Sequence, residues 1–486
     1  MKEFGRSLRE LTRVEQLIIL YLALPVAAFY LGWLKPVLGV GCTALLALVL
    51  LPGIGKKHPS ESGRLPLPTV VAVILVATCW SSLGGAGHLF YANSDWPVRD
   101  AVLRDLVAFP WPVDYATTFY NADYSLLLRA PLGYFLFPAL AAKIVGLRYA
   151  DYLLLGWTIA GTSLLFLHLA ASCRKNSRLF LTILVFIFFS GMDVIGTLIN
   201  HDPLSPTAHL EWWGKYFQYS SMTTVLFWVP NHGLPGWLAA SLIVRNWRNP
   251  RFLPAAFIVT TLVPLWSPLS AVGVLLLFAA TSFHHLRNSG WRFLLVPDTF
   301  IAAIIALPIA RYLTLGAATI ESGWVMSAVS SPAVFFSAYT LFVSLELAVG
   351  AVALAGEIRY KTGYAWLTAS ALLFLLLLPF YYYGPGNDLA MRVSIPLLAV
   401  LALRTAAILG TCLEERAYVL CAFSIALLAI GAVTPACEIA RSLLSPRWQP
   451  DPATNLVDVT QANAPHYYVK LPAGEIPWVL RKPSGP

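Results

Sequence analysis

Apolar runs recur along the whole chain and are separated by short polar connections. Many of these runs are about 17 to 22 residues long, the length that a helix needs to span the hydrocarbon core of a bilayer. The pattern predicts helices at residues 15–34, 37–54, 67–84, 131–147, 150–171, 179–199, 233–246, 252–266, 268–286, 294–315, 333–355, 364–383, 393–411 and 417–434, and a half-helix at 219–230. We therefore expect an all-α polytopic membrane protein with about 13–15 transmembrane helices.

The basic residues fall mainly in connections that alternate along the chain, as the positive-inside rule predicts. The other connections then share the outer face. This gives a transmembrane domain at 1–435, with outer loops 84–130, 200–235 and 381–392, and a polar outer-face tail at 436–486. One conflict stays open: Arg148 and the basic run 174–178 cannot both be cytoplasmic if 150–171 spans once. Either 131–147 is not a full span, or the basic run 174–178 is an exception to the positive-inside rule and 219–230 crosses the membrane.

Composition supports the membrane assignment. Of the 486 residues 58% are hydrophobic and 12% charged, and the mean hydropathy is +0.69. A soluble domain could not bury that much apolar surface. The net charge of +9 follows from the basic loops and is not an indication of nucleic-acid binding. The six cysteines are scattered without metal-ligand spacing, so neither a disulfide framework nor a metal site is predicted.

Three acids and two arginines stand close together in the first outer loop, from Asp95 to Asp105. Residues 98–106 have helical periodicity, and Asp95 directly precedes the expected helix start. In one interpretation Asp95 only caps the helix and the arginines pair with the acids. In the other, Asp95 is a general base or nucleophile, and Arg99, Asp100 and Arg104 contact the substrate.

Aromatic residues alternate with carboxylates and histidines farther along the outer loops. Asp123 and Tyr124 suit a carbohydrate, since rings stack on sugar CH groups and acids bind hydroxyls, although an interfacial aromatic belt has the same composition. His201 and His232 are candidate phosphate contacts or merely solvated side chains. Asp193 lies near the outer end of an apolar run, where a carboxylate is costly and is therefore a functional candidate.

A turn rich in glycine precedes the 393–411 run, and Tyr383, Asp388 and Arg392 surround it. Arginine suits a phosphate because its planar guanidinium can bond two oxygens. The alternative is an i,i+4 ion pair of Asp388 and Arg392 at a helix start, which contributes only a few tenths of a kcal/mol.

The chain contains no phosphate-binding loop, dinucleotide fingerprint, zinc-protease motif or nucleophile elbow. Its first outer loop resembles that of the GT-C glycosyltransferases, polytopic enzymes that take a sugar from a polyprenyl-phosphate carrier. The likeness is nearest to the dolichyl-phosphate-glucose dependent glucosyltransferases. It rests on Asp95-Trp96-Pro97-Val98, on the run 109–115, and on Asp123-Tyr124, about 40 residues in all.

The resemblance implies a membrane glycosyltransferase that moves a sugar from a polyprenyl-phosphate donor to an acceptor hydroxyl of a glycan or lipid-linked molecule. Asp95 would be the general base, Arg392 would contact the carrier phosphate, and the anomer would be inverted. Membrane lipids are the other expected partner, and nucleic acid is not one. No cofactor is assigned, and a divalent cation stays open. The absence of a glycosylation-rich or signal-bearing outer domain favours a bacterial inner membrane with a periplasmic site.

Three other functions remain as alternatives. A lipid-linked glycan polymerase or ligase would also use polyprenyl carriers, but it would depend more on outer-loop arginines and histidines. A lipid or glycan transporter (flippase) would favour charges buried within helices and two related halves, and no internal repeat is visible here. A structural subunit of a larger membrane complex is the third.

Overall fold

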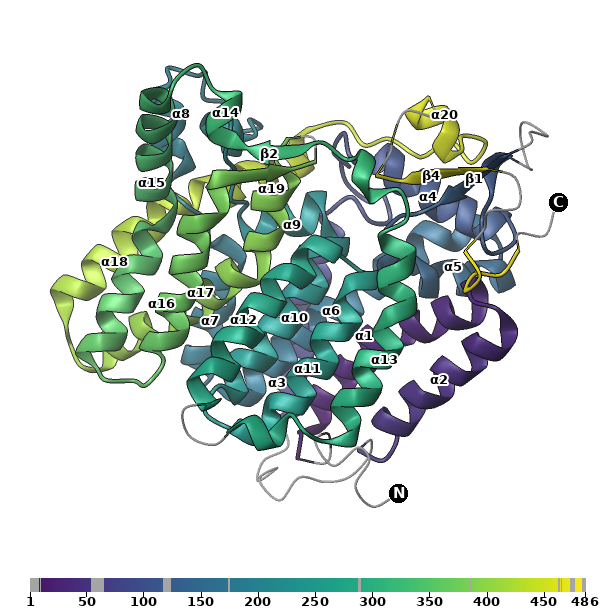
Figure 1. Cartoon of the computed structure of the whole chain (residues 1–486). Coiled ribbons are helices and arrows are strands. Elements are labelled where there is room, and N and C mark those ends of the chain that lie inside the picture. Colours follow the sequence, from purple (N-terminus) through teal and green to yellow (C-terminus); the bar gives the residue numbers. More distant parts are fainter. Residues whose placement is uncertain are drawn as a thin grey trace.

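The structure, a computed structural model, is a bundle of helices with short strands and helices gathered at one end (Figure 1). It describes residues 8, 10–53, 65–116, 124–173, 175–286, 290–384, 386–461, 464, 466–472 and 477–482. Within this part of the chain seven helical segments are long and apolar enough to cross a membrane: Arg13–Trp33, Leu147–Ser172, Asn176–Ile199, Pro268–Leu286, Pro332–Arg359, Asp388–Glu414 and Tyr418–Leu444. The chain is therefore a mainly helical integral membrane protein.

The bundle is formed by α1 (Arg13–Trp33), α2 (Pro36–Leu50), α3 (Leu67–Ser82), α5 (Gly133–Val145), α6 (Ala150–Ser172), α7 (Asn176–Phe188), α10 (Pro230–Asn246), α11 (Leu253–Leu262), α12 (Pro268–Leu286), α13 (Pro297–Leu313), α15 (Pro332–Arg359), α16 (Ala365–Leu377), α17 (Asp388–Glu414), α18 (Tyr418–Gly431) and α19 (Val433–Leu444). Shorter helices are α4 (Trp96–Ala108), α8 (Asp193–Ile199), α9 (Met222–Trp228), α14 (Val325–Ala328) and α20 (Leu456–Thr460). Strand β1 (Tyr124–Leu128) pairs antiparallel with β4 (Tyr468–Pro472), and β2 (Ser322–Trp324) with β3 (Tyr381–Tyr383).

Helix α17 is the most enclosed of the long helices and packs against α7, α10, α12, α15 and α16. Its side chains are apolar on every side, as a helix surrounded by other helices requires. Arg404 is the charged exception in its buried middle, and its Nη2 lies 2.7 Å from Oε1 of Glu357 on α15. A buried charge needs such a partner, so this pair fixes α15 beside α17.

The start of α4 is held against α9 by two side chains that bond the same carbonyl. Asn93 Nδ2 and Trp96 Nε1 each donate to the oxygen of Phe227 at 2.9 Å. Gly85 leaves room for the indole, because a Cβ there would lie 1.9 Å from Trp96 Nε1. Pro97 then occupies the first turn of α4, where its missing N–H costs nothing. These contacts fix the position of Asp95, which lies between Asn93 and Trp96.

The C-terminal tail is tied to the first outer loop, and near its end Arg481 N also donates to Trp33 O of α1 at 2.8 Å. Strand β4 of the tail pairs with β1, and α20 packs against α4 (Figure 1). Asp105 is fully buried on α4 and accepts hydrogen bonds from Leu456 N at 2.9 Å and the Tyr115 hydroxyl at 2.8 Å. Arg104 Nη1 also bonds this carboxylate, at 2.9 Å. Asp105 therefore links the tail, α4 and the loop that follows it.

Replacing Asp105 with alanine should destabilise the protein by about 2 kcal/mol, since hydrogen bonds to a charged group each contribute about 1.5–3 kcal/mol and water compensates in part. The thermal melting temperature should fall, and proteases should cut within 445–472 faster than in the wild type. The matched control is Glu415→Ala, because Glu415 is exposed beyond the end of α17. Equal protease resistance of the Asp105 variant and the wild type would refute this anchoring role.

The apolar run 131–147 is shorter as a helix than the sequence pattern indicates. Helix α5 has 13 residues, and at 1.5 Å per residue it extends only about 20 Å. Arg148, which follows it, lines a cavity with Asp100 and Asp451. Lys175 instead pairs with Glu414 at the far end of α17, at 3.1 Å. Helix α5 is thus shorter than the about 20 residues that span a bilayer, which favours the first of the two alternatives, that 131–147 is not a full span.

Two other predicted boundaries differ from the structure. The run 179–199 is broken between α7 and α8, where Met192 N bonds Leu345 O at 3.2 Å instead of continuing the helix. Gly191 is needed there, because a Cβ would lie 2.0 Å from Glu346 Oε2. Helix α19 continues to Leu444, so the irregular tail starts at Ser445 rather than at residue 436.

Fewer helices of spanning length are found than the sequence pattern predicts. Seven segments meet the length and composition of a span in the described residues, against the 13–15 expected. Five further apolar helices are shorter than 18 residues: Pro36–Leu50, Leu67–Ser82, Gly133–Val145, Pro250–Leu265 and Ala365–Phe380. The apolar runs in the sequence include residues of turns, so they overstate the helix lengths. The two short β ladders were not predicted.

Candidate functional site

Two adjoining cavities lie at the end of the bundle that carries α4 and the β ladders. The loop cavity, of about 500 Å³, is lined by α4, the 209–220 connection, α9, α10 and the start of α17. The helix cavity, of about 310 Å³, is lined by α4, the connection from β1 to α5, α10, α12, the end of α13 and the start of α17. Six residues line both cavities: Arg99, His232, Asp388, Arg392, His466 and Tyr467. The cavities therefore form one site, to which the predicted outer loops 84–130, 200–235 and 381–392 all contribute.

Asp95 lies on the wall of the loop cavity, immediately before α4. Its side chain is 41% exposed, and its Oδ2 lies 3.1 Å from Nη2 of Arg99. Arg99 Nη1 also donates to the backbone oxygen of Asp95 at 2.7 Å. The carboxylate makes no capping hydrogen bond to α4. Arg99 thus orients the Asp95 carboxylate, which is open to the cavity and does not cap α4.

The turn before α17 brings Asp388 and Arg392 to the same site. Gly384 and Gly386 have φ values of 79° and 67°, and Asn387 has 59°, so three left-handed positions reverse the chain between β3 and α17. Glycine and asparagine adopt this conformation at the lowest cost. Arg392 Nε and Nη2 then bond Asp388 Oδ1 at 2.9 and 2.7 Å. The predicted i,i+4 pair exists, and Arg392 lines both cavities as well.

His232 is a buried member of the shared wall. Its Nδ1 lies 2.7 Å from Ser267 Oγ, and its Nε2 lies 3.1 Å from Asn231 Nδ2. An amide nitrogen can only donate, so Nε2 accepts and Nδ1 carries the proton. This arrangement fits a neutral, fixed imidazole, which can border an anion site without adding a charge.

Three arginines converge on the helix cavity: Arg99, Arg129 and Arg392. Burial lowers the pKa of Arg129, yet an arginine stays charged at neutral pH. The remaining wall is mostly apolar and comes from Pro131, Phe135, Leu269, Val272, Leu313 and Ile320. The cavity thus combines a cationic end with an apolar side, as the phosphate and the hydrocarbon chain of one ligand would require.

Two tail residues, His466 and Tyr467, complete both cavities. Arg129 N donates to Tyr467 O at 2.7 Å, next to the β1–β4 ladder. Burial lowers the pKa of His466, and the positive charges of Arg392 and Arg129 lower it further, although Asp388 acts in the opposite direction. These effects favour the neutral form of His466.

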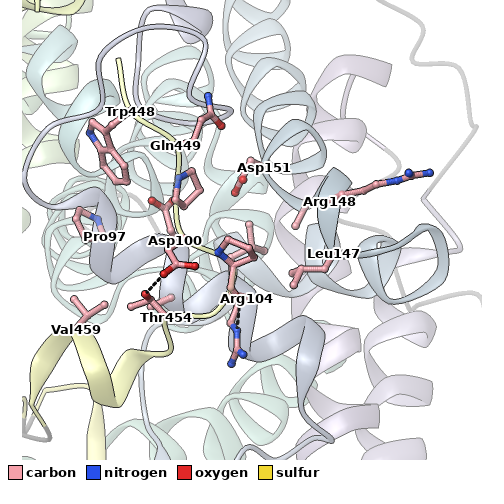
Figure 2. Close-up of a pocket in the computed structure, with 16 residues that line it drawn as sticks. Pro97, Asp100, Arg104, Leu147, Arg148, Asp151, Trp448, Gln449, Thr454 and Val459 are labelled. Atoms are coloured by element: carbon pink, nitrogen blue, oxygen red, sulfur yellow. Dashed lines mark hydrogen bonds between the residues drawn. The ribbon is translucent and has the colours of Figure 1, made fainter. Parts of the chain in front are cut away.

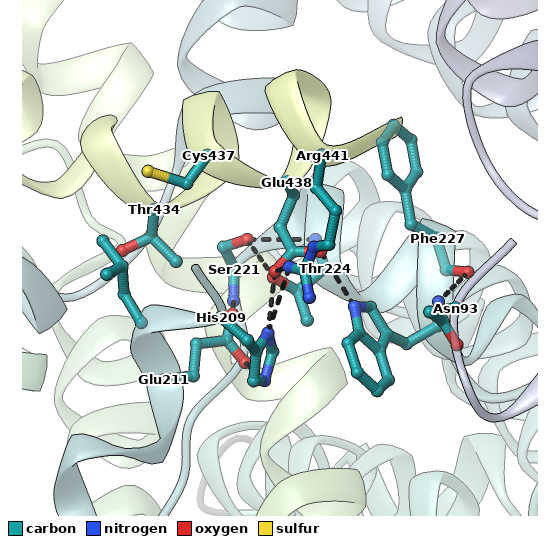
Figure 3. Close-up of polar contacts among 12 residues, drawn as sticks. Asn93, His209, Glu211, Ser221, Thr224, Phe227, Thr434, Cys437, Glu438 and Arg441 are labelled. Atoms are coloured by element: carbon teal, nitrogen blue, oxygen red, sulfur yellow. Dashed lines mark hydrogen bonds and ion pairs between the residues drawn. The ribbon is translucent and has the colours of Figure 1, made fainter. Parts of the chain in front are cut away.

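A buried polar network adjoins the loop cavity (Figure 3), and its members His209, Gln218 and Trp228 line that cavity. His209 Nδ1 lies 2.7 Å from Glu438 Oε1, and Trp228 Nε1 donates to Glu438 Oε2 at 2.8 Å. Glu211 accepts from Ser221 N and from Gln218 Nε2, both at 2.8 Å. Burial raises the pKa of Glu211 to about 7, so this carboxyl group changes charge in the physiological range.

Four of the other predicted site residues line neither of these cavities: Asp100, Arg104, Tyr124 and His201. Asp100 and Arg104 are on α4 but face a third cavity, because each residue of a helix turns about 100° from the one before it. Tyr124 belongs to β1, where Lys470 Nζ lies 4.2 Å from its ring centre. His201 is exposed and has a left-handed φ of 57°. Asp123 lies outside the described residues. Tyr383 does line the helix cavity.

Sequence reasoning missed Arg129, His209, His466 and Tyr467. Arg129 had a usable signal, since it is a lone charge directly before the apolar run 131–147. His209 stands two residues before Glu211 in a loop already assigned to the outer face. His466 and Tyr467 gave no signal beyond their place in a polar tail, since only the pairing of β4 with β1 brings them to the site.

The arrangement can bind an anion that carries an apolar chain. Three arginine side chains supply donors, two histidines and two tyrosines surround them, and an apolar wall adjoins them. The loop cavity shares Arg99 with the helix cavity and is also lined by Asp95, Trp212, Gln218 and Trp228. These side chains suit a carbohydrate, because the polar ones can bond hydroxyls and the indole rings can stack on sugar faces.

No family model, no curated protein and no solved structure matches this chain.

Proposed function

We propose that the protein is a membrane glycosyltransferase that transfers a sugar from a polyprenyl-phosphate donor to an acceptor hydroxyl of a glycan or lipid-linked molecule. Asp95 is the general base, and the reaction inverts the anomeric carbon. The site faces the periplasm of a bacterial inner membrane. The observation that carries the proposal is that a carboxylate and a three-arginine cluster line two joined cavities, one of which has an apolar wall.

The helix cavity suits the donor. A polyprenyl phosphate keeps its chain in the bilayer and its phosphate at the surface, and the cavity has the same division into an apolar wall and a cationic end. Arg99 and Arg392 line both cavities, so a phosphate between them would have its sugar in the loop cavity. Arginine donors there also stabilise the negative charge that grows on the phosphate as it leaves.

The loop cavity suits the acceptor. The acceptor oxygen attacks the anomeric carbon, its proton passes to the Asp95 carboxylate, and the carbon–oxygen bond to the phosphate breaks. The polyprenyl phosphate leaves with that electron pair. One displacement at the carbon inverts its configuration. A positioned carboxylate contributes about 10²–10⁴-fold to such a step, and Arg99 orients it through the 3.1 Å contact.

The full chain, purified in detergent and reconstituted in liposomes, tests this proposal. A polyprenyl-phosphate glucose with a labelled sugar is offered with a panel of glycan and lipid-linked acceptors, and products are analysed by mass spectrometry and by the NMR coupling of the anomeric proton. We expect labelled product with the inverted anomer and release of polyprenyl phosphate.

Three results would contradict the proposal. Movement of a fluorescent polyprenyl phosphate between the leaflets, without transfer, would identify a transporter. Transfer of an entire oligosaccharide rather than one sugar would identify a polymerase or ligase. Failure of farnesyl phosphate, a short soluble carrier phosphate, to bind at all would remove the donor assignment of the helix cavity.

A further inference from the structure

A third cavity, the tail cavity, lies beside α4 and has a volume of about 560 Å³, and Figure 2 shows residues that line it. Its walls come from α4, from the turn before α6 and the start of α6, and from residues 448–459 of the tail. Asp100 and Asp151 both line it. None of the six residues shared by the loop and helix cavities lines it, so it is a separate place for a ligand.

Three potential metal ligands meet beside this cavity, and each comes from a different segment. His88 belongs to the turn after α3, Asp100 to α4, and Asp151 to the first turn of α6. One donor atom from each lies within 4.8 Å of the other two. The closest contact is between His88 Nε2 and Asp100 Oδ2, at 3.1 Å. Two donor atoms on a single cation at about 2.0–2.2 Å are at most about 4.4 Å apart, so the three ligands would have to close only slightly around it.

The carboxylate of Asp100 is buried without the bonds that a buried charge normally has. Its side chain is only 7% exposed, and that of His88 only 1%. Apart from the contact with His88, neither carboxylate oxygen of Asp100 has a hydrogen-bond partner among the described residues. The two arginines on α4 are engaged elsewhere, Arg99 with Asp95 and Arg104 with Asp105. A buried carboxylate in this condition is costly unless a cation joins it.

We propose that His88, Asp100 and Asp151 bind a divalent transition-metal cation. One imidazole nitrogen and two carboxylate oxygens form a donor set that suits Mn²⁺ or Zn²⁺, whereas Mg²⁺ and Ca²⁺ prefer oxygen donors alone. The tail cavity gives the cation a route to the site, and water can fill its remaining coordination positions. The ring of Trp448 covers His88, with ring centres 4.7 Å apart, and shields the cation on the tail side.

The cation would join the turn after α3, α4 and α6 at one point. Because Asp95 stands at the start of α4, the metal fixes the helix that carries the proposed base without touching the substrate. This role does not depend on the proposed transfer reaction, so metal binding is measured without a substrate.

Binding is tested with the full-length protein in detergent, stripped of metal with EDTA and titrated with Mn²⁺. The EPR signal of free Mn²⁺ reports binding, and Zn²⁺ and Mg²⁺ are added as competitors. We expect about one Mn²⁺ per chain, displacement by Zn²⁺ but not by equal Mg²⁺, and a rise in the melting temperature, since a ligand that binds only the folded state stabilises it.

Asp151 is the partly exposed ligand of the three, so it is the best position for a test substitution. Asp151→Asn should weaken Mn²⁺ affinity at least about tenfold, and Asp100→Asn should do the same if it folds. The matched control is Asp451→Asn, because Asp451 lines the same cavity, is exposed and is not part of the cluster. The proposal is overturned if the wild type binds no Mn²⁺ or Zn²⁺, or if Asp151→Asn binds Mn²⁺ as tightly as Asp451→Asn does. If the wild type binds neither Mn²⁺ nor Zn²⁺, the cluster is an ion pair of protonated His88 with the two acids.

Discussion

Replacing Asp95 with asparagine is expected to reduce sugar transfer by about 100- to 10,000-fold while leaving the fold and donor binding nearly unchanged. The amide has almost the shape of the carboxylate, and its oxygen can still accept from Arg99 Nη2, which lies 3.1 Å from Oδ2. It cannot take the proton of the acceptor. The side chain is 41% exposed and does not cap α4, so little stability depends on its charge.

The measurement is the initial rate of labelled product at saturating donor, together with farnesyl phosphate affinity and melting temperature. Asp202→Asn is the control, because Asp202 is an exposed acid of the second outer loop that lines neither the loop nor the helix cavity. Near-normal turnover of the Asp95 variant would show that another group takes the proton. The buried Glu211, in the polar network beside the loop cavity, would then be tested next.

Replacing Arg392 with alanine is expected to weaken donor affinity about 100- to 1,000-fold, because an arginine–phosphate contact consists of charge-assisted hydrogen bonds of about 1.5–3 kcal/mol each. The loss has a second cause. Arg392 pairs with Asp388 at 2.7 Å, so its removal leaves the Asp388 carboxylate facing the incoming phosphate. Arg392→Lys keeps the charge but not the two-pronged geometry, and should have a smaller effect.

The two causes can be separated by a double variant. Asp388→Asn added to Arg392→Ala removes the repulsion and should recover part of the lost affinity, while acceptor affinity stays unchanged throughout. Arg311→Ala is the control, since Arg311 is an exposed arginine of α13 that lines neither cavity. If titration with farnesyl phosphate gives equal affinity for the wild type and Arg392→Ala, Arg392 is only the partner of Asp388 at the helix start.

Much of the helical framework could be predicted from the sequence, because apolar periodicity is a local property. Helices α1, α6, α12 and α15 begin and end close to the predicted residues. Helix α4 was also predicted, but its charged residues were not assigned to different faces of the helix. Arg99 is four residues from Asp95 and shares its face, whereas Asp100 is turned away by one more residue. Helical geometry alone could have assigned Asp100 and Arg104 to another face.

The rest depends on contacts between distant segments. Arg129 and His466 are more than 300 residues apart and meet only because β1 pairs with β4, each a five-residue strand. Such short strands form through tertiary contacts rather than through intrinsic propensity. Likewise the buried pairs around Glu438 and His209 join a late helix to an early loop, and no local pattern indicates them.

The tail also sets the order in which the site can be completed during biosynthesis. His466 and Tyr467 line both cavities, and translation reaches them only after every helix from α1 to α19 has been made. A nascent chain is therefore fully inserted in the membrane before β4 can pair with β1 and close the site. A chain interrupted between residues 445 and 465 would contain all of its long helices and still lack His466 and Tyr467 in the walls of both cavities.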